Sequence, residues 1–239
     1  MASSSGAEGA SLDDDYESLI STTDVELLKR AWRNEKAAPE ILRFESHLIS
    51  RVKEQIQLME ETVEEKSTGG TDPLSVSLYQ MDLDRTLFLF RSYLRIRIQK
   101  IEKYMFHIRK TEELWSRLSK DEKDFTRTCT NDLTRHLEES VLSKLPENYQ
   151  SVLKQSVISE EDDMVPEPQL DTFVLCRSKE YLTGIQLEDG PLCFEKSKKN
   201  SSIDYSGRSK LFEMEPGVLH FICYKSIKAL VESGKVDLL

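Results

Sequence analysis

The chain has 239 residues, of which 38% are hydrophobic and 32% charged, and its formal net charge is −10. Its longest apolar runs are short, whereas a membrane-spanning helix needs about 20 apolar residues, so the composition excludes a transmembrane protein. The first ten residues have no basic residue and no apolar core, and we expect neither a secretory signal nor a mitochondrial presequence. The four cysteines lie far apart and predict free thiols in a reducing compartment.

The negative charge is concentrated in two stretches of the chain. Residues 1–28 contain seven acidic residues and residues 155–176 contain six, and neither stretch has a basic residue. Residues 1–22 also have few large apolar side chains, which predicts a disordered acidic tail. A solubilising role is one interpretation of this tail. The other is a docking motif, in which one face of a short helix carries Leu12, Tyr16, Leu19 and Ile20.

Two amphipathic helices are predicted after the tail. Thr23 and Glu26 match a capping box, in which each side chain bonds a free backbone amide of the other residue. The helix that starts there is expected to end before Pro39, because proline cannot continue a helix. Apolar residues spaced three and four apart predict a second helix over about residues 46–66.

The third predicted helix is the longest and is apolar on two sides. Asp72 and Pro73 form a favoured start, and the helix is expected to run to about residue 110. One face carries Leu83, Leu87, Phe90, Leu94, Ile98, Ile101, Met105 and Ile108. A second face carries Phe88, Tyr93 and Ile96. A helix that is apolar on two sides normally has packing partners on both, so the second face is a candidate interface.

A fourth helix is predicted to start at a capping box formed by Ser119 and Glu122 and to end before Pro146. Four amphipathic helices with short connections favour an antiparallel helical bundle over residues 23–158. The acidic, proline-containing stretch over residues 159–171 then predicts a linker between two domains.

The chain after this linker is predicted to form a small β-rich domain over residues 172–239, with one short helix over residues 225–232. Short β-like runs, separated by glycine and proline, lie at residues 172–177, 182–187, 210–214, 218–222 and 236–238. The expected core of this domain contains Phe173, Phe221, Tyr224, Leu230, Val236 and Leu238. The predicted fold class is α+β, with an N-terminal antiparallel helical bundle followed by a small β-rich C-terminal domain.

No pattern typical of catalysis, phosphate binding or metal binding occurs in the sequence. The four histidines are solitary, with no second histidine within one turn of helix. We therefore expect no enzyme activity, no catalytic residue, no cofactor and no metal ion.

The third helix carries a cluster of basic residues: Arg85, Arg91, Arg95, Arg97, Lys100, Lys103, Arg109 and Lys110. One interpretation is a surface for an acidic protein partner or for nucleic acid. The other is a set of solvated flanks of a core helix, some of them paired with acids of the second helix. Exposed aromatic residues are not interleaved with these bases, which weighs against direct DNA contact.

Residues 32–42, with the sequence WRNEKAAPEIL, closely resemble the signature W-x-N-E-K-x-A-P-E-x-L of the Sld-five subunits of the GINS DNA-replication complex. Residues 92–104, SYLRIRIQKIEKY, are similar to a helix of the same family. The start of the family's C-terminal domain and its last helix and strand are matched by residues 166–174, 220–227 and 230–236. The matches follow the family's order and leave out the acidic tail and a Lys/Ser-rich loop at residues 195–209.

This resemblance implies a non-enzymatic subunit of a heterotetramer, with a helical A-type domain first and a β-rich B-type domain second. The implied partners are three sister GINS subunits and, through the assembly, the MCM helicase, the Cdc-forty-five protein and the leading-strand polymerase. GINS, MCM and Cdc-forty-five together form the active replicative helicase for initiation and fork progression, so a nuclear location is implied. The alternative is a helical adaptor subunit of an unrelated tethering or trafficking assembly, because a bundle does not fix function.

The resemblance also selects candidates for a subunit interface or a structural corner: Trp32, Asn34, Glu35, Lys36, Pro39, Phe88, Tyr93, Arg95, Ile96, Arg97 and Lys100. Among them, Asn34 can bond the backbone, Pro39 breaks the helix and Trp32 can anchor the turn that follows. A fixed corner within the chain and a contact with another subunit are both compatible with these residues.

Overall fold

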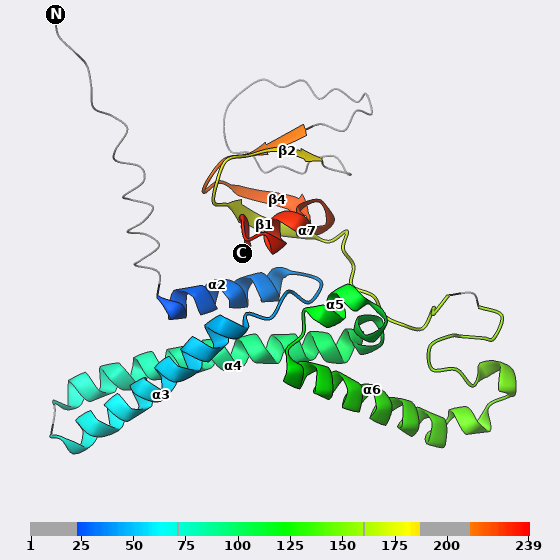
Figure 1. Cartoon of the computed structure of the whole chain (residues 1–239), viewed down its shortest axis with the longest axis horizontal. Helices are drawn as coiled ribbons and strands as arrows, with labels where there is room; N and C mark the ends of the chain where they lie inside the picture. Colours follow the sequence, from blue (N-terminus) through cyan, green and yellow to red (C-terminus); the bar gives the residue numbers. More distant parts are fainter. Residues whose placement is uncertain (1–22, 71, 160, 187–210) are drawn as a thin grey trace, which may run out of the picture. The chain divides into compact units, whose positions relative to one another are not determined.

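The computed structural model describes residues 23–70, 72–159, 161–186 and 211–239 (Figure 1). The predicted acidic tail with its docking motif and the Lys/Ser-rich loop lie outside the described residues. The described chain groups into two compact units. The first contains residues up to Trp32 together with Glu45–Arg91, and the second contains Arg33–Phe44 together with Ser92–Leu239. The domain boundary predicted at residues 159–171 stays a prediction.

The first part of the described chain is helical. Its helices are α2 (Asp24–Ala37), α3 (Ser46–Thr68), α4 (Pro73–Lys110), α5 (Glu112–Ser116) and α6 (Lys120–Ser140), followed by the 3-10 turns η1 (Leu142–Lys144) and η2 (Glu147–Tyr149). The hydroxyl of Thr23 accepts a hydrogen bond of 3.3 Å from the amide of Glu26, as the predicted cap requires. The capping box of Ser119 and Glu122 is also confirmed, with both of its hydrogen bonds formed.

The fourth predicted helix is shorter than expected. Helix α6 ends at Ser140, where the sequence predicted a helix up to Pro146. Val141 leaves helical geometry, with φ of −128°, and is 48% exposed. The residues after Ser140 therefore lack the buried contacts that stabilise most helices in proteins.

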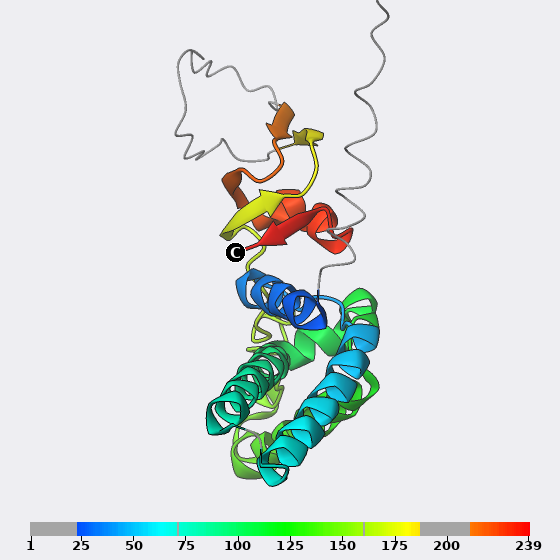
Figure 2. The same ribbon diagram turned by 90° about the vertical axis from the view of Figure 1, so that its left-hand side faces the viewer.

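In the first unit, α3 and the beginning of α4 form a helical hairpin (Figure 2). The connection contains Gly70, whose φ of +72° lies in the left-handed region that favours glycine. Beside it, the ammonium of Lys66 lies 4.9 Å from the centre of the Tyr79 ring. The buried side chains of the hairpin are Leu48, Ile49, Val52 and Ile56 of α3 and Leu83 and Thr86 of α4.

The C-terminal part of the second unit contains two small antiparallel sheets and one helix. Their elements are β1 (Phe173–Ser178), β2 (Leu182–Gln186), β3 (Leu211–Met214), β4 (Leu219–Cys223), α7 (Tyr224–Glu232) and β5 (Val236–Leu238). The strand order is β4-β1-β5 in one sheet and β2-β3 in the other. The predicted fold class, a helical region followed by a small β-rich region, is confirmed.

The core of this part lies on one face of the β4-β1-β5 sheet. Its buried residues include Val174, Cys176, Ile222, Tyr224, Ile227, Val231, Val236 and Leu238, with Leu230 partly buried against them. Phe221 was predicted to belong to this core, and this prediction is wrong. Its neighbour Ile222 points into the core, so Phe221 points to the opposite face, where it is 36% exposed. Phe173 lies on that same outer face and is half-buried.

Candidate functional site

The segment that contains the signature and the middle of α4 meet in a buried charge network within the second unit. The guanidinium of Arg97 is fully excluded from solvent. It donates hydrogen bonds to Glu35 at 2.9 Å, to both oxygens of Glu122 at 2.7 and 3.1 Å, and to the carbonyl of Leu42 at 2.8 Å. One arginine thus joins α2, α4, α6 and the chain after α2.

Lys100, one turn along α4 from Arg97, extends this network. Its ammonium donates to a carboxylate oxygen of Glu35 at 2.9 Å and to the carbonyl of Glu40 at 2.8 Å. Burial lowers the pKa of Lys100, while the nearby Glu35 carboxylate opposes this effect. For Arg97, burial also disfavours the charge, but the carboxylates of Glu35 and Glu122 outweigh it and raise the pKa. The side chains therefore compensate one another's buried charge.

Glu40 forms the centre of a second network, which reaches α7. Its carboxylate is 3% exposed and lies 3.3 Å from the guanidinium of Arg117. It accepts a hydrogen bond from the hydroxyl of Tyr224 at 3.1 Å and one from Lys228 at 3.2 Å. Burial, followed by the Glu40 charge, raises the pKa of the Tyr224 hydroxyl, so Tyr224 stays neutral and donates. Arg117 is also paired with Glu232, at 2.5 Å.

The signature segment also bonds directly to the last strand. The side-chain oxygen of Asn34 accepts a hydrogen bond of 2.8 Å from the amide of Leu238. Ala38 is buried in the same core as β1, β5 and α7. Residues 33–44 therefore link α4, α6 and the C-terminal sheet within the second unit, which is a structural role for the signature.

An exposed apolar stripe lies on the hairpin of the first unit. Along α4, Leu74, Leu78, Met81 and Phe88 are 67%, 57%, 47% and 65% exposed. These four residues fall at spacings of four, three and seven and so share one face of the helix, and we call them the hairpin stripe. Isolated surface leucines are common, but four large exposed apolar side chains on one helix face are typical of an interaction surface.

The structure separates the residues that the sequence assigned to one interface. Phe88 and Arg95 are exposed, and Ile96 is half-buried. Tyr93, however, is only 1% exposed and belongs to the core, so its assignment to the second apolar face is wrong. Ile98, assigned to the buried face, is 40% exposed. In the signature segment, Trp32 and Pro39 are half-buried and Lys36 is exposed.

The basic cluster of α4 is likewise divided. Arg97 is buried in the network and Lys100 is partly buried there, whereas Lys110 is paired with Asp162 at 2.8 Å. Arg85, Arg91 and Arg95 are exposed, and none of them is paired with an acid in the part of the chain that the structure describes. The cluster is therefore not one continuous basic surface.

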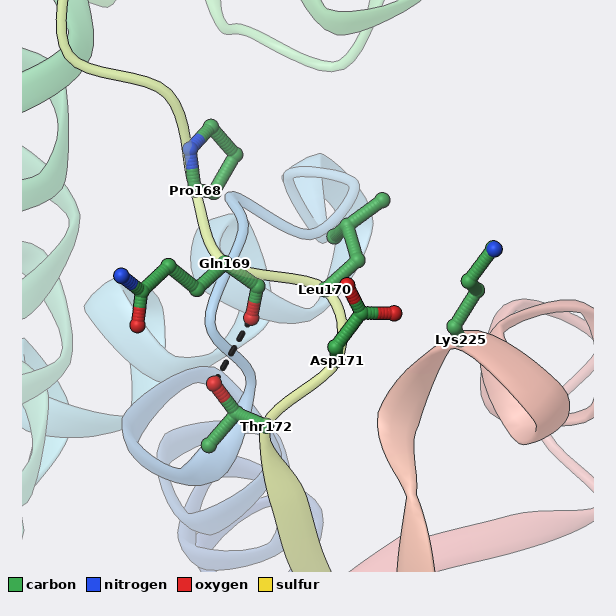
Figure 3. A pocket seen from close by; sticks show the side chains of 6 residues that line it. All are labelled: Pro168, Gln169, Leu170, Asp171, Thr172 and Lys225. Carbon is green, nitrogen blue, oxygen red and sulfur yellow. Dashed lines mark hydrogen bonds between the residues drawn. The ribbon is translucent and has the colours of Figure 1, made fainter. Parts of the chain in front are cut away.

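A shallow hollow opens where β1 begins. It has a volume of about 560 Å³ and is lined by Pro168, Gln169, Leu170, Asp171, Thr172 and Lys225 (Figure 3). The hydroxyl of Thr172 donates to the carbonyl of Gln169 at 2.7 Å, which holds the turn before the strand. The lining has one cation, one anion and no pair of groups arranged for catalysis. Among the described residues, no group of three histidines, cysteines or acids could hold a metal ion, and no helix is long and apolar enough to span a membrane.

Comparison with known proteins decides the family. The model of the GINS complex protein helical bundle domain matches residues 47–141, and that of the DNA replication complex GINS protein SLD5 C-terminus matches residues 168–239. The chain is 57% identical over 239 residues to the DNA replication complex GINS protein SLD5 of Arabidopsis thaliana, covering 100% of both chains. The chain belongs to the SLD5 family. It is also 34% identical to the SLD5 protein of Xenopus laevis over 233 residues (95% of both chains) and 33% identical to that of Rattus norvegicus over 220 residues (90% of this chain, 88% of the relative).

Membership of the SLD5 family confirms the resemblance found in the sequence. The alternative, an adaptor subunit of an unrelated assembly, is therefore dropped. Sequence reasoning found the signature of the family but missed two of its buried partners, Arg117 and Glu122. Glu122 was predicted only as half of a capping box, and its second contact, with Arg97, depends on packing between helices. Glu40 lies in the signature, but nothing in the sequence marked it as the acceptor for Tyr224.

Proposed function

We propose that this chain is a non-enzymatic, structural subunit of a nuclear four-subunit GINS complex. In this proposal it assembles with three sister subunits, and the assembly joins the MCM helicase and the Cdc-forty-five protein to form the active replicative helicase. The same assembly connects the helicase to the leading-strand polymerase. The names of the relatives support membership of a DNA replication complex, and the further partners are part of the proposal.

The observation that carries the assembly role is the hairpin stripe. Its side chains are 47–67% exposed, although α3 and α4 each bury other apolar residues within the first unit. Obligate subunit interfaces are more apolar than the ordinary protein surface and resemble a domain core divided in two. Arg85 lies between Met81 and Phe88 on this face of α4, and Arg91 lies one turn beyond Phe88, so the surface that covers the stripe is expected to present acids among its apolar side chains.

The buried networks supply the second requirement of a scaffold, which is a fixed shape. Arg97 and Glu40 each bind side chains from several helices, and these contacts set the path of residues 33–44. The buried carboxylates of the signature, Glu35 and Glu40, are both bonded to side chains of other elements. We therefore propose that the signature positions elements and that exposed surfaces bind partners.

The test is reconstitution with the three sister subunits. The full chain, co-expressed with them, should elute as one complex with one copy of each subunit by size-exclusion chromatography with light scattering. The double variant Leu78→Glu, Phe88→Glu should leave the complex, because two carboxylates would have to be buried in an apolar interface. Lys53→Glu, at an exposed position of α3, is the control and should assemble normally. Assembly of the double variant at the wild-type level would contradict the proposed role of the stripe.

A further inference from the structure

The outer face of the β4-β1-β5 sheet is apolar at one end and positively charged at the other. Phe173, Leu175 and Arg177 of β1 alternate with the buried residues of that strand. Leu219 and Phe221 of β4 lie opposite them in the register. We call these five residues the outer sheet face.

The apolar part of the outer sheet face is accessible. Leu175, Leu219 and Phe221 are 39%, 50% and 36% exposed. The rings of Phe173 and Phe221 are stacked, with centres 5.4 Å apart, and form an apolar platform at one end. The core and α7 lie against the residues of the other face, such as Val174 and Ile222. A sheet with apolar residues on both faces normally packs against a second layer on each of them.

The positive charge of Arg177, at the far end of this face, indicates which charge a partner should carry. Arg177 is exposed and has no acidic partner among the residues that the structure describes. Its cross-strand neighbours are Leu219 on β4 and Asp237 on β5. The carboxylate of Asp237 lies 3.4 Å from the ammonium of Lys179, so Asp237 forms its ion pair with Lys179. A carboxylate supplied by a partner would therefore complement Arg177.

Building on the proposed function, we propose that the outer sheet face binds an amphipathic helix of a replication protein outside the four-subunit complex. From Phe173 to Arg177 the strand rises by about 13 Å, at roughly 3.3 Å per residue. A helix rises 1.5 Å per residue and returns to the same face after seven or eight residues. The partner helix therefore carries an apolar residue on the Phe173–Phe221 platform and a carboxylate seven or eight residues away, at Arg177.

The contrast with the hairpin stripe places this partner outside the tetramer. Three of the four side chains of the stripe are more than half exposed, as expected of a surface that a permanent partner covers. The apolar side chains of the outer sheet face are at most half exposed, and a free arginine closes one end. Charges at the edge and a modest apolar centre are typical of smaller interfaces between separately stable partners.

The experiment uses the reconstituted four-subunit complex with the photo-crosslinking residue p-benzoylphenylalanine in place of Leu219. The complex is mixed with purified MCM hexamer, Cdc-forty-five protein and leading-strand polymerase, irradiated, and the crosslinked peptide is sequenced. The expected crosslink is to a helix of one of these proteins that has the apolar and acidic spacing described above.

In separate binding assays, Leu219→Glu and Arg177→Glu should each weaken binding to that protein at least tenfold. Thr183→Glu, at an exposed position of β2, is the matched control and should bind normally.

The outcomes distinguish this inference from the proposed function. Replacing the partner's acidic residue with arginine should restore binding to the Arg177→Glu variant, because the ion pair is re-formed with its charges exchanged. The same replacement should not restore binding to Leu219→Glu. A crosslink to a sister subunit, or binding by both variants at the wild-type level, would overturn the inference while leaving the tetramer in place. If the wild-type chain does not join the three sister subunits, the proposed function fails and the inference fails with it.

Discussion

Arg97 and Glu35 are 62 residues apart in the sequence, yet their side chains meet at 2.9 Å with essentially no exposure to solvent. Glu122 completes the arrangement from a third helix. When a cation is buried between two carboxylates, the loss of any one of the three destabilises the fold. The remaining charges are then unpaired, and no water is present to solvate them. The position of the signature segment therefore depends on α4 and α6.

The first prediction concerns the removal of this cation. Arg97→Ala leaves the carboxylates of Glu35 and Glu122 buried without a counter-charge and should lower the free energy of unfolding by about 3–5 kcal/mol. Gln99→Ala is the control, two residues away on the same helix, exposed and outside the interface candidates. It should change stability by less than about 0.5 kcal/mol. Urea denaturation of the reconstituted four-subunit complex measures both, and equal effects would contradict the central role of Arg97.

The buried face of α4 shows what sequence periodicity could and could not predict. The bounds of α4 were predicted correctly from its start and its apolar spacing, but the kink at Tyr104, with φ of −116° and ψ of 18°, was not. The choice of face was partly wrong, because two of the buried positions, Thr86 and Arg97, are polar and broke the apolar pattern. Tyr93 lies between them and was therefore assigned to another face. A buried arginine is recognisable only when its carboxylate partners are known, and those come from distant parts of the chain.

The outer sheet face was missed for a related reason. Strand alternation predicts which residues share a face, and the strands themselves were found at nearly the right positions. In β1, however, Phe173 and Leu175 on one face are as apolar as Val174 and Cys176 on the other. The pattern alone therefore cannot say which face is buried. The contact of α7 with one face decides it, and this contact depends on tertiary structure.

The second prediction is a loss of stability at alkaline pH. Burial raises the pKa of the Cys176 thiol from 9.0 to about 12. Below pH 9 the thiol is protonated in both states, but above it the unfolded state releases the proton more readily than the native state. Stability should therefore fall as pH rises from 9 toward 12, with up to about 1.4 kcal/mol per pH unit from this group.

Urea denaturation at pH 8, 9 and 10, with a reducing agent present, measures this slope. Cys176→Ala removes the titrating group, so it should be less stable overall but show a shallower decline with pH. Tyr224 also has a raised pKa, and the chosen range stays at or below its ordinary value of about 10. An identical slope in the wild type and the variant would contradict the assignment to Cys176.

The third prediction concerns the isolated chain. Without sister subunits the hairpin stripe has no cover within the described chain, so the full chain expressed alone should self-associate, as seen by light scattering. The double variant Leu78→Glu, Phe88→Glu should scatter less while losing the ability to assemble. A monodisperse wild-type monomer would contradict this prediction.

The last prediction concerns the C-terminal strand β5. Val236 and Leu238 are almost completely buried, and the full burial of each is worth roughly 1.5–3 kcal/mol. Removal of residues 236–239 also takes away the bond between Asn34 and the amide of Leu238, and it leaves one edge of β1 without its partner. A β-rich part of this size seldom has more than about 3–5 kcal/mol of stability of its own, so its cooperative unfolding should be lost.

Removal of Leu239 alone, which is 37% exposed, is the control and should leave the sheet intact. Thermal melting and co-purification with the sister subunits should show the loss of a transition and weaker assembly for the long truncation only. Normal melting and full recovery of that truncated chain would mean that β5 contributes little to either.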